Sequence, residues 1–231
     1  YQGGTLGTPI AFLVRNEDCR PEDYALLEHL YRPGHGDYTW QQKYGLRDHR
    51  GGGRCSARST VPVVIAGAIA KQLLKEKGIQ FTTHHSSRII DCTITGLPVG
   101  LGSPLYGRLQ SQLSAAMLSI PSATGFEFGE GFHAAEMSAE QYLDRFNPDF
   151  TTQTNHCGGL MGGLSNGMPL QFRVAFHPVI SNASPLPCVD HQGQEQLIDL
   201  PGRHDKNQTP RAAAIVEAVA ALVLIDNALT R

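Results

Sequence analysis

Residues 59–78 read STVPVVIAGAIAKQLLKEKG, and this stretch decides how the fold is interpreted. A hydroxyl residue, Ser59 or Thr60, can cap a helix, Pro62 suits a first turn, and Gly78 is a typical stop. The stretch therefore predicts one long apolar helix. Because strands and other helices do not alternate regularly around it, we expect an α+β sandwich and not a βαβ alternation.

Shorter periodic segments, bounded by glycine and proline, make up the rest of the chain. The last helix should begin with Thr209 as cap and Pro210 in its first turn, and it is apolar nearly all round, which indicates burial. We expect strands at residues 8–14, 94–102, 125–132 and 172–176, helices at 20–30, 104–119 and from 209, a glycine-rich turn region at 155–167, and a polar hairpin or loop at 185–200.

Length and composition favour one domain that spans residues 1–231. With 41% hydrophobic residues the chain can bury a real core, and the formal net charge of -2 argues against a protein that coats nucleic acid. The five cysteines include no C-x-x-C pair and the ten histidines no H-E-x-x-H spacing, so neither disulfides nor a metal are expected. The most apolar stretch, residues 212–224, contains Glu217 and is too short for a membrane span. We therefore expect a cytoplasmic protein with no membrane or nucleic-acid partner.

An arginine-rich and glycine-rich stretch precedes the long helix. Residues 47–58 read RDHRGGGRCSAR and hold four arginines and three consecutive glycines. Arginine presents a planar fork that fits phosphate or carboxylate oxygens, and glycine lets backbone N–H groups approach such oxygens. The positive end of the following helix strengthens the field. The pattern predicts an anion site, with a solvated loop of surface ion pairs as the alternative interpretation.

Three further stretches are less specific. NHCGGLMGG at residues 155–163 fits either close approach to a flat or phosphorylated ligand or tight packing. RHD at residues 203–205 fits either a surface ion pair or a proton-transfer pair. GEGFHA at residues 129–134 formally fits a dinucleotide fingerprint, but the helix that it should open is weakly signalled. The residues alone thus indicate chemistry on a phosphorylated small molecule and leave the reaction open.

Eight blocks, in the same order along the chain, resemble those of the chorismate synthase family. The first four are RPGH at 32–35, QKYG at 42–45, RGGGR with SAR at 50–58, and AGAIAK at 66–71. The later four are GLG with a proline at 100–104, a block at 117–121 that leads to GEGF at 129–132, TN through SNGMP at 154–169, and GRHD with PRA at 202–212. The resemblance covers nearly the whole chain.

The resemblance implies a sandwich of antiparallel sheets and helices that usually forms a homotetramer. It implies a carbon–oxygen lyase of the shikimate pathway, which feeds aromatic amino-acid biosynthesis. Such a lyase converts 5-enolpyruvylshikimate 3-phosphate to chorismate and phosphate in an anti-1,4 elimination. Members need reduced FMN, although no net redox change occurs. Whether the chain reduces its own flavin with NADP(H) or takes it from an external flavin reductase stays open.

The matching blocks also imply roles for single residues. The implied catalytic residues are His35, an acid near the flavin, and Asp205, which helps proton transfer near the flavin N5. The implied substrate-binding residues are Arg32, Arg58 and Arg203. The implied cofactor-binding residues are Arg54, Ser56, Ala57, Arg58, Asn155, His177, Ser181, Arg203 and Asp205.

The chain departs from the family pattern in several places. The amino-terminal Gly-Glu-Ser-His-Gly block is missing, and the sequence jumps near residues 88–91 over a segment that members carry. We interpret both as removed or unrecorded segments. Ser59 stands where members commonly have Glu, residues 177–179 (HPV) replace a flavin-binding Lys-Pro-Thr, and residues 206–207 (KN) replace Pro-Cys. These changes predict weaker binding of FMN.

Two other functions use the same arginines without the lyase reaction. A non-catalytic binder of a phosphorylated ligand or RNA would not need His35 or Asp205. RNA modules interleave aromatic side chains with basic ones for base stacking. The aromatic residues among the arginines here are only Tyr31, Tyr38, Trp40 and Tyr44. An inactive relative that retained the anion site is the other alternative.

Overall fold

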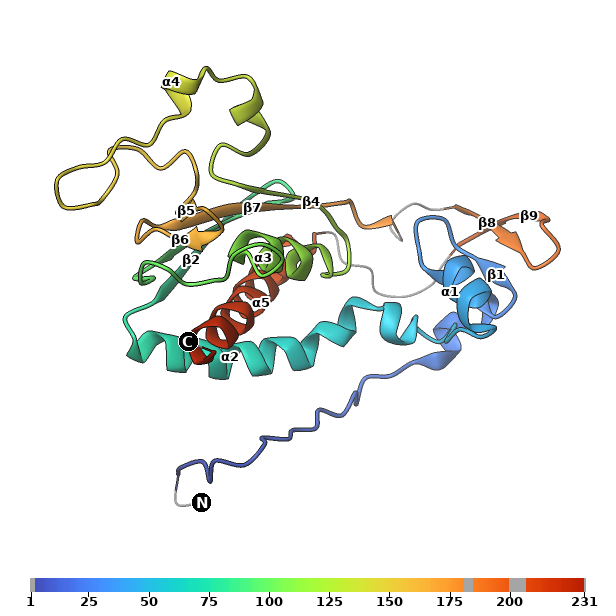
Figure 1. Cartoon of the computed structure of the whole chain (residues 1–231). Helices are drawn as coiled ribbons and strands as arrows, with labels where there is room; N and C mark the ends of the chain where they lie inside the picture. The colour runs from blue at the N-terminus through green and yellow to red at the C-terminus, as the bar shows by residue number, and fades with distance from the viewer. Residues whose placement is uncertain (1–2, 181–184, 200–206, 231) are drawn as a thin grey trace.

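A four-stranded antiparallel sheet and three helices form the body of the protein (Figure 1). The computed structural model describes residues 3–180, 185–199 and 207–230. The sheet has the order β2-β3-β7-β4, with strands β2 (Gln80–Ser86), β3 (Ile89–Thr95), β7 (Leu170–Phe176) and β4 (Ala123–Phe128). The helices are α2 (Val61–Glu76), α3 (Leu109–Leu118) and α5 (Thr209–Leu229).

The helices cover one face of this sheet, and α5 lies between the sheet and α2 (Figure 1). Alternate residues of β3 and β7 are buried, as expected for strands that turn one face toward a core. The large core side chains include Leu74, Ile90, Ile94, Leu109, Leu113, Met117, Leu170, Phe172 and Leu224. The predicted α+β class of antiparallel sheets and helices is confirmed.

A smaller sheet stands beside the body, next to the arginine-rich stretch (Figure 1). Its strands, in the order β1-β8-β9, are β1 (Leu30–Tyr31), β8 (Leu186–Asp190) and β9 (Glu195–Ile198). The short elements around it are the 3-10 helices η1 (Pro21–Leu27), η2 (Gly53–Cys55) and η3 (Ala57–Thr60), and α1 (Asp37–Tyr44). A separate small core of Leu30, Leu186 and Cys188 holds this lobe together.

An arm projects from the body beyond β4 (Figure 1). Its elements, with the hairpin that follows it, are η4 (Gly131–Ala135), α4 (Ala139–Tyr142), β5 (Leu160–Met161) and β6 (Leu164–Ser165). The side chains of Phe132, Phe146 and Phe150 on this arm are exposed. The arm therefore adds little to the core and extends the surface of the molecule.

Helix α5 is long and apolar enough, by length and composition, to cross a membrane. In the structure it packs against α2, α3, β2 and β3. Its one acidic residue within the apolar run, Glu217, pairs with Lys71 of α2 and accepts a hydrogen bond of 2.7 Å from Thr83 of β2. Because its charge is paired inside the fold, α5 is a core helix, and the predicted burial of the last helix is confirmed.

Several predicted boundaries shift in the structure. The helix predicted from Ser59 or Thr60 to Lys77 is confirmed as α2, but Thr60 donates its hydroxyl to the carbonyl of Ala57 at 2.6 Å and its side chain does not cap the helix. The hairpin predicted at residues 185–200 is β8 and β9. The strand expected at 94–102 ends at Thr95, because the glycines and prolines that follow form turns.

The strand predicted at residues 8–14 is wrong. In the structure this segment is extended but exposed, and no strand of the described residues pairs with it. A strand needs a neighbour for its backbone N–H and C=O groups, and the described part of the chain offers it none. The apolar pattern indicates β propensity, but it does not show whether another strand is available to pair with this segment.

Gly67 sets the close crossing of α2 and α5. A β-carbon at this position would lie 2.3 Å from the β-carbon of Ala218. We therefore expect Gly67→Ala to lower the free energy of unfolding by about 1–3 kcal/mol, although the same change at an open helix site stabilises by about 1 kcal/mol. Urea unfolding measures the difference. Ala68→Gly, at the exposed neighbouring position, is the matched control, and a stabilised Gly67→Ala protein would contradict the close crossing.

Candidate active site

A tight turn between β1 and α1 carries His35. Gly34 in this turn has a left-handed φ of 69°. A β-carbon on Gly34 would lie 2.2 Å from Cδ1 of Ile180, so any side chain here would push the two segments apart. The turn therefore packs against Ile180, which follows β7 and is far away in the sequence.

Asp37 is the centre of a buried ion-pair network beneath this turn. Its carboxylate accepts hydrogen bonds from Nε and Nη2 of Arg32 at 2.8 and 3.0 Å, and Nη1 of Arg47 lies 3.7 Å from it. The three side chains are between 5% and 9% exposed. Burial would raise the pKa of Asp37, but the hydrogen bonds and charge of Arg32, helped by Arg47, lower this pKa below its usual value. Asp37 thus stays ionised and holds both arginines.

Arg47 also ties the turn to the small lobe. Its Nη2 donates to the backbone carbonyls of Leu27, Glu28 and Leu30. Its guanidinium lies over the ring of Tyr31, 5.3 Å from the ring centroid. This arginine of the predicted anion site therefore stabilises the lobe and does not face a ligand.

Arg32, the implied substrate-binding residue, is held in the same way. Its guanidinium and its backbone N–H both bind Asp37. In the free protein this side chain orders the turn on which His35 lies. A contact of Arg32 with the substrate stays a prediction.

His35 presents a buried atom that has no partner. Its Nε2 has no hydrogen bond within the described part of the chain. Burial lowers the pKa of His35, the charge of Arg32 lowers it further, Asp37 opposes this shift, and His177 adds to it. The imidazole is therefore neutral near pH 7 in the free protein. Because an unpaired buried polar atom costs free energy, Nε2 is placed to meet a ligand.

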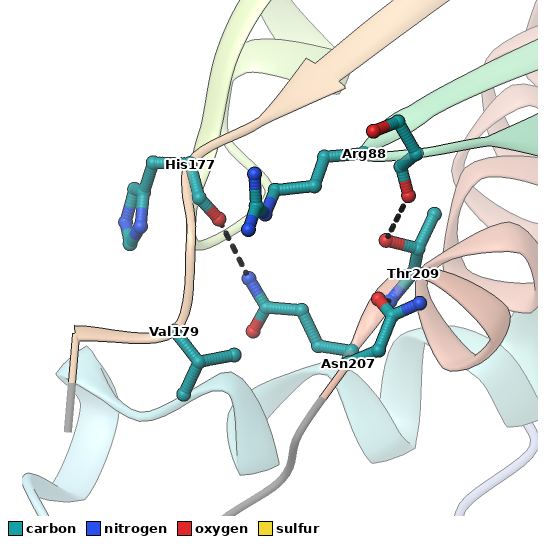
Figure 2. A pocket seen from close by; sticks show the side chains of 7 residues that line it. Arg88, His177, Val179, Asn207 and Thr209 are labelled. Carbon is teal, nitrogen blue, oxygen red and sulfur yellow. Dashed lines mark hydrogen bonds between the residues drawn. The ribbon is translucent and has the colours of Figure 1, made fainter. Parts of the chain in front are cut away.

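A cavity of about 240 Å³ opens beside His177 (Figure 2). Its lining residues are Ser87, Arg88, His177, Val179, Asn207, Gln208 and Thr209. Gln208 donates to the carbonyl of His177 at 3.4 Å, and Thr209 donates its hydroxyl to the carbonyl of Ser87 at 3.3 Å. These bonds join the β2–β3 turn, the end of β7 and the start of α5. His177, an implied cofactor-binding residue, thus lies on a cavity and acts electrostatically on His35.

The 3-10 helix η2 lies against the turn of His35. A β-carbon on Gly36 would be 3.3 Å from the sulfur of Cys55 in η2. Arg54, the neighbour of Cys55, is exposed, and no carboxylate of the described residues forms an ion pair with it. This arginine is a cation that a ligand can use.

The next implied cofactor residues, Ser56, Ala57 and Arg58, form η3 and its cap. Oγ of Ser56 accepts a hydrogen bond of 3.2 Å from the backbone N–H of Arg58. Arg58 lines a second cavity, of about 350 Å³, whose other lining residues are Phe12, Leu13, Val14, Arg15, Asn16, Val61 and Pro62. Arg58 is therefore close to a cavity, as a ligand-binding arginine should be, but this cavity differs from the one beside His177.

Asn155 lies at the opposite end of β7 from His177. Its Nδ2 donates to the carbonyl of Pro169 at 2.8 Å, and its Oδ1 accepts from the backbone N–H of Gly159 at 2.8 Å. A seven-residue strand such as β7 is about 20 Å long. Within one chain the structure does not bring Asn155 together with His177, and its implied contact with a cofactor stays a prediction.

Asp144 fixes the glycine-rich loop that carries Asn155. Its carboxylate accepts hydrogen bonds from the hydroxyl of Thr154 at 2.6 Å and from the backbone N–H groups of His156 and Cys157 at 2.8 and 3.0 Å. Burial would raise the pKa of Asp144, but these hydrogen bonds lower it to about 2. Sequence reasoning missed this residue, because nothing in the pattern marks an acid that closes a loop ten residues later.

Three of the implied site residues, Ser181, Arg203 and Asp205, lie outside the described residues. Over the parts that are described, no group of three or more His, Cys, Asp or Glu side chains could hold a metal ion. The site that the structure defines therefore consists of the His35 turn, η2, and the segment after β7 with the cavity at its side.

Comparisons with known proteins identify the family. The family model described as chorismate synthase matches residues 1–89 and 87–229, which is nearly the whole chain. The chain belongs to the chorismate synthase family. A chorismate synthase of Christiangramia forsetii is 37% identical over 273 aligned residues, and the alignment covers 98% of this chain and 77% of that relative. The chorismate synthase of Opitutus terrae is 39% identical, with 98% and 77% covered.

A solved structure agrees with this assignment at the level of the fold. The "Crystal Structure of Chorismate Synthase" superimposes with a TM-score of 0.64 and covers 84% of this chain and 70% of that chain, at 22% identity. At this identity the likeness concerns the fold alone. The sheet and helices described above are thus those of a chorismate synthase fold.

Proposed function

We propose that the protein converts 5-enolpyruvylshikimate 3-phosphate to chorismate and phosphate. The observation that carries this proposal is the buried Nε2 of His35, which has no hydrogen-bond partner among the described residues and lies in the field of Arg32 and His177. Elimination of phosphate needs cations for the leaving oxyanion and a group that moves a proton. Two relatives named chorismate synthase, at 37% and 39% identity over 98% of the chain, support this activity.

The chemistry of the elimination defines what the site must do. The C–O bond to the phosphate breaks and its electron pair leaves with the phosphate. A ring proton is removed, the electron pair of its C–H bond forms one double bond, and the existing ring double bond shifts to the carbon that loses the phosphate, so the net oxidation state is unchanged. Exposed Arg54 and Arg58 are suited to hold anionic groups of the ligands, and His35 is suited to hold a proton near the reacting atoms.

We propose reduced FMN as the cofactor, and the donor set of the site fits it. Arg54 and Arg58 offer charged donors, and Nε2 of His35, which no described residue hydrogen-bonds, offers a polar contact. When bound, reduced FMN would supply transient electron density for the loss of phosphate. His177 lines the cavity where an anionic part of the cofactor would be held.

Ligand binding would change the protonation of His35. In the free protein burial and Arg32 lower the pKa of this histidine. The substrate carries a phosphate and two carboxylates, and an anion near an imidazole raises the imidazole pKa. Binding of the anionic ligands would therefore protonate His35 and make it an acid only when the site is filled.

We further propose a homotetramer in the cytoplasm, with reduced flavin made by the chain itself with NADP(H) or by an external reductase. The exposed apolar segment at residues 8–14, which lacks a strand partner in the described part of the chain, supports an assembly. The break of the family match at residues 87–89 supports a segment that relatives carry between β2 and β3.

An anaerobic assay tests the activity. We expect chorismate absorbance to appear when the protein is mixed with 5-enolpyruvylshikimate 3-phosphate and chemically reduced FMN, and to be absent without the flavin. Omitting the protein is the control for spontaneous loss of phosphate. Tight binding of flavin and substrate without turnover would instead indicate a relative that kept the anion site and lost the reaction.

A further inference from the structure

The turn between β2 and β3 consists of two residues, Ser87 and Arg88, whose backbone is fixed on both sides. Ser87 has a left-handed φ of 55° and accepts the hydroxyl of Thr209 at its carbonyl. The carbonyl of Arg88 accepts the backbone N–H of Phe176 at 2.9 Å. The base of the Arg88 side chain is therefore held at the edge of the cavity beside His177.

The Arg88 side chain lines this cavity and reaches toward the carbonyl of His177 (Figure 2). The ring of His177 points away from Arg88 in the same view, and its Nδ1 lies 2.6 Å from the carbonyl oxygen of Pro178. No carboxylate of the described residues forms an ion pair with Arg88. Arg88, and not His177, is thus the cation directed into the cavity.

Two other lining residues, Asn207 and Gln208, carry neutral amide donors that suit an anion. The side-chain amides of Asn207 and Gln208 lie at the start of α5, whose positive end favours negative charge. The first N–H groups of α5 are already engaged, because Thr209 donates to Oδ1 of Asn207 and Arg211 to the carbonyl of Gln208. Binding must therefore come from the side chains, and a planar guanidinium is the donor that best fits a phosphate.

We propose that Arg88 anchors the phosphate of the flavin cofactor in this cavity. The inference rests on the proposed function, which has two phosphate monoesters, the cofactor and the substrate. The cavity contains His177, whose implied role is with the cofactor alone, whereas Arg58, which lines the other cavity, is implied to bind both substrate and cofactor. The phosphate in the Arg88 cavity is therefore assigned to the flavin.

Arg88 also lies where this chain differs from its relatives. The family match breaks at residues 87–89, and the alignment with the Christiangramia forsetii enzyme is 273 residues long, more than the 231 residues of this chain. The short turn brings an arginine to the cavity at this junction. It supplies a cation to the cavity that His177 also lines, and the sequence resemblance implies a lysine at position 177.

Titration of flavin fluorescence with oxidised FMN and with riboflavin tests the assignment, because the two flavins differ only in the phosphate. We expect Arg88→Gln to raise the dissociation constant of FMN by about tenfold to a hundredfold, as for the loss of a charged hydrogen bond, and to leave that of riboflavin unchanged. Arg88→Lys should restore part of the affinity for FMN. Arg145→Gln, an exposed arginine on the arm, is the matched control.

The other outcomes are distinct. Equal losses for FMN and riboflavin would mean that Arg88 shapes the fold or contacts the ring, and they would overturn the assignment. If Arg88→Gln left the affinity for FMN unchanged and weakened binding of 5-enolpyruvylshikimate 3-phosphate, measured by calorimetry, the cavity would be assigned to the substrate. That result would overturn the assignment to the flavin. A wild-type protein that binds neither flavin would overturn the proposed cofactor itself, before any variant is compared.

Discussion

Replacing Asp37 with asparagine is expected to lower the free energy of unfolding by about 3–5 kcal/mol. The carboxylate is 5% exposed, and it is the charge partner of two arginines that are themselves 9% and 6% exposed. An amide of the same shape would leave Arg32 and Arg47 as buried cations without a counter-charge. The turn of His35 lies directly above this network, so the same change should also loosen the site.

Urea unfolding at pH 7 measures the loss, and pH supplies a second check. The pKa of Asp37 is lowered in the folded protein, so its contribution is present above the ordinary carboxyl pKa of about 4 and is lost as the pH falls through the folded value. The difference in the free energy of unfolding between wild type and Asp37→Asn should therefore become smaller as the pH falls. Asp48→Asn, whose ion pair with Arg50 is exposed, should cost less than about 1 kcal/mol. Equal costs for the two variants would contradict the buried network.

The long helices were predictable because their signals are local. Pro62 and Gly78 bracket α2, and Pro210 marks the first turn of α5, so each boundary was correct within a few residues. The run at residues 8–14 failed because strand formation depends on a partner. A helix forms its backbone hydrogen bonds within its own segment, whereas a strand needs a second strand, which the local sequence does not reveal.

The candidate site was predictable in its residue types and not in its geometry. The arginine cluster was recognised from composition, yet Arg32 and Arg47 turn inward because Asp37 lies five residues after Arg32 at the start of α1. The proximity of His35 to His177 depends on packing of Gly34 against Ile180. Such a contact between distant parts of the chain has no trace in local spacing.

The position of Arg88 at a cavity could also not be predicted from the local sequence. In the sequence it is one basic residue near a break in the family pattern, with no neighbour that suggests binding. Its role follows only from the pairing of β2 with β3 and from the bond of Phe176 to its carbonyl, which place it at a cavity. Topology, more than composition, decides which of the exposed arginines can reach a ligand.

Replacing His35 with glutamine is expected to lower kcat by about a hundredfold to ten-thousandfold, while FMN and substrate bind within about threefold of wild type. Nε2 of His35 is buried and has no hydrogen-bond partner among the described residues. Glutamine offers an amide N–H for binding but cannot transfer a proton. Steady-state kinetics under anaerobic conditions, with calorimetry for both ligands, separates turnover from binding.

The pH profile makes the assignment specific to a titrating group. Because burial and Arg32 lower the pKa of His35 in the free protein, kcat/KM should report a group that titrates below the ordinary histidine value of about 6.5. The bound anions raise that pKa, so kcat, which reports the complex, should show the same group at higher pH. His133→Gln, an exposed histidine on the arm, should leave both profiles unchanged. If the His35→Gln enzyme kept the wild-type kcat and both pH titrations, another group would hold the catalytic proton. Loss of the two titrations in this variant would instead identify His35 as the titrating group, because a residue that only shapes the pocket does not titrate.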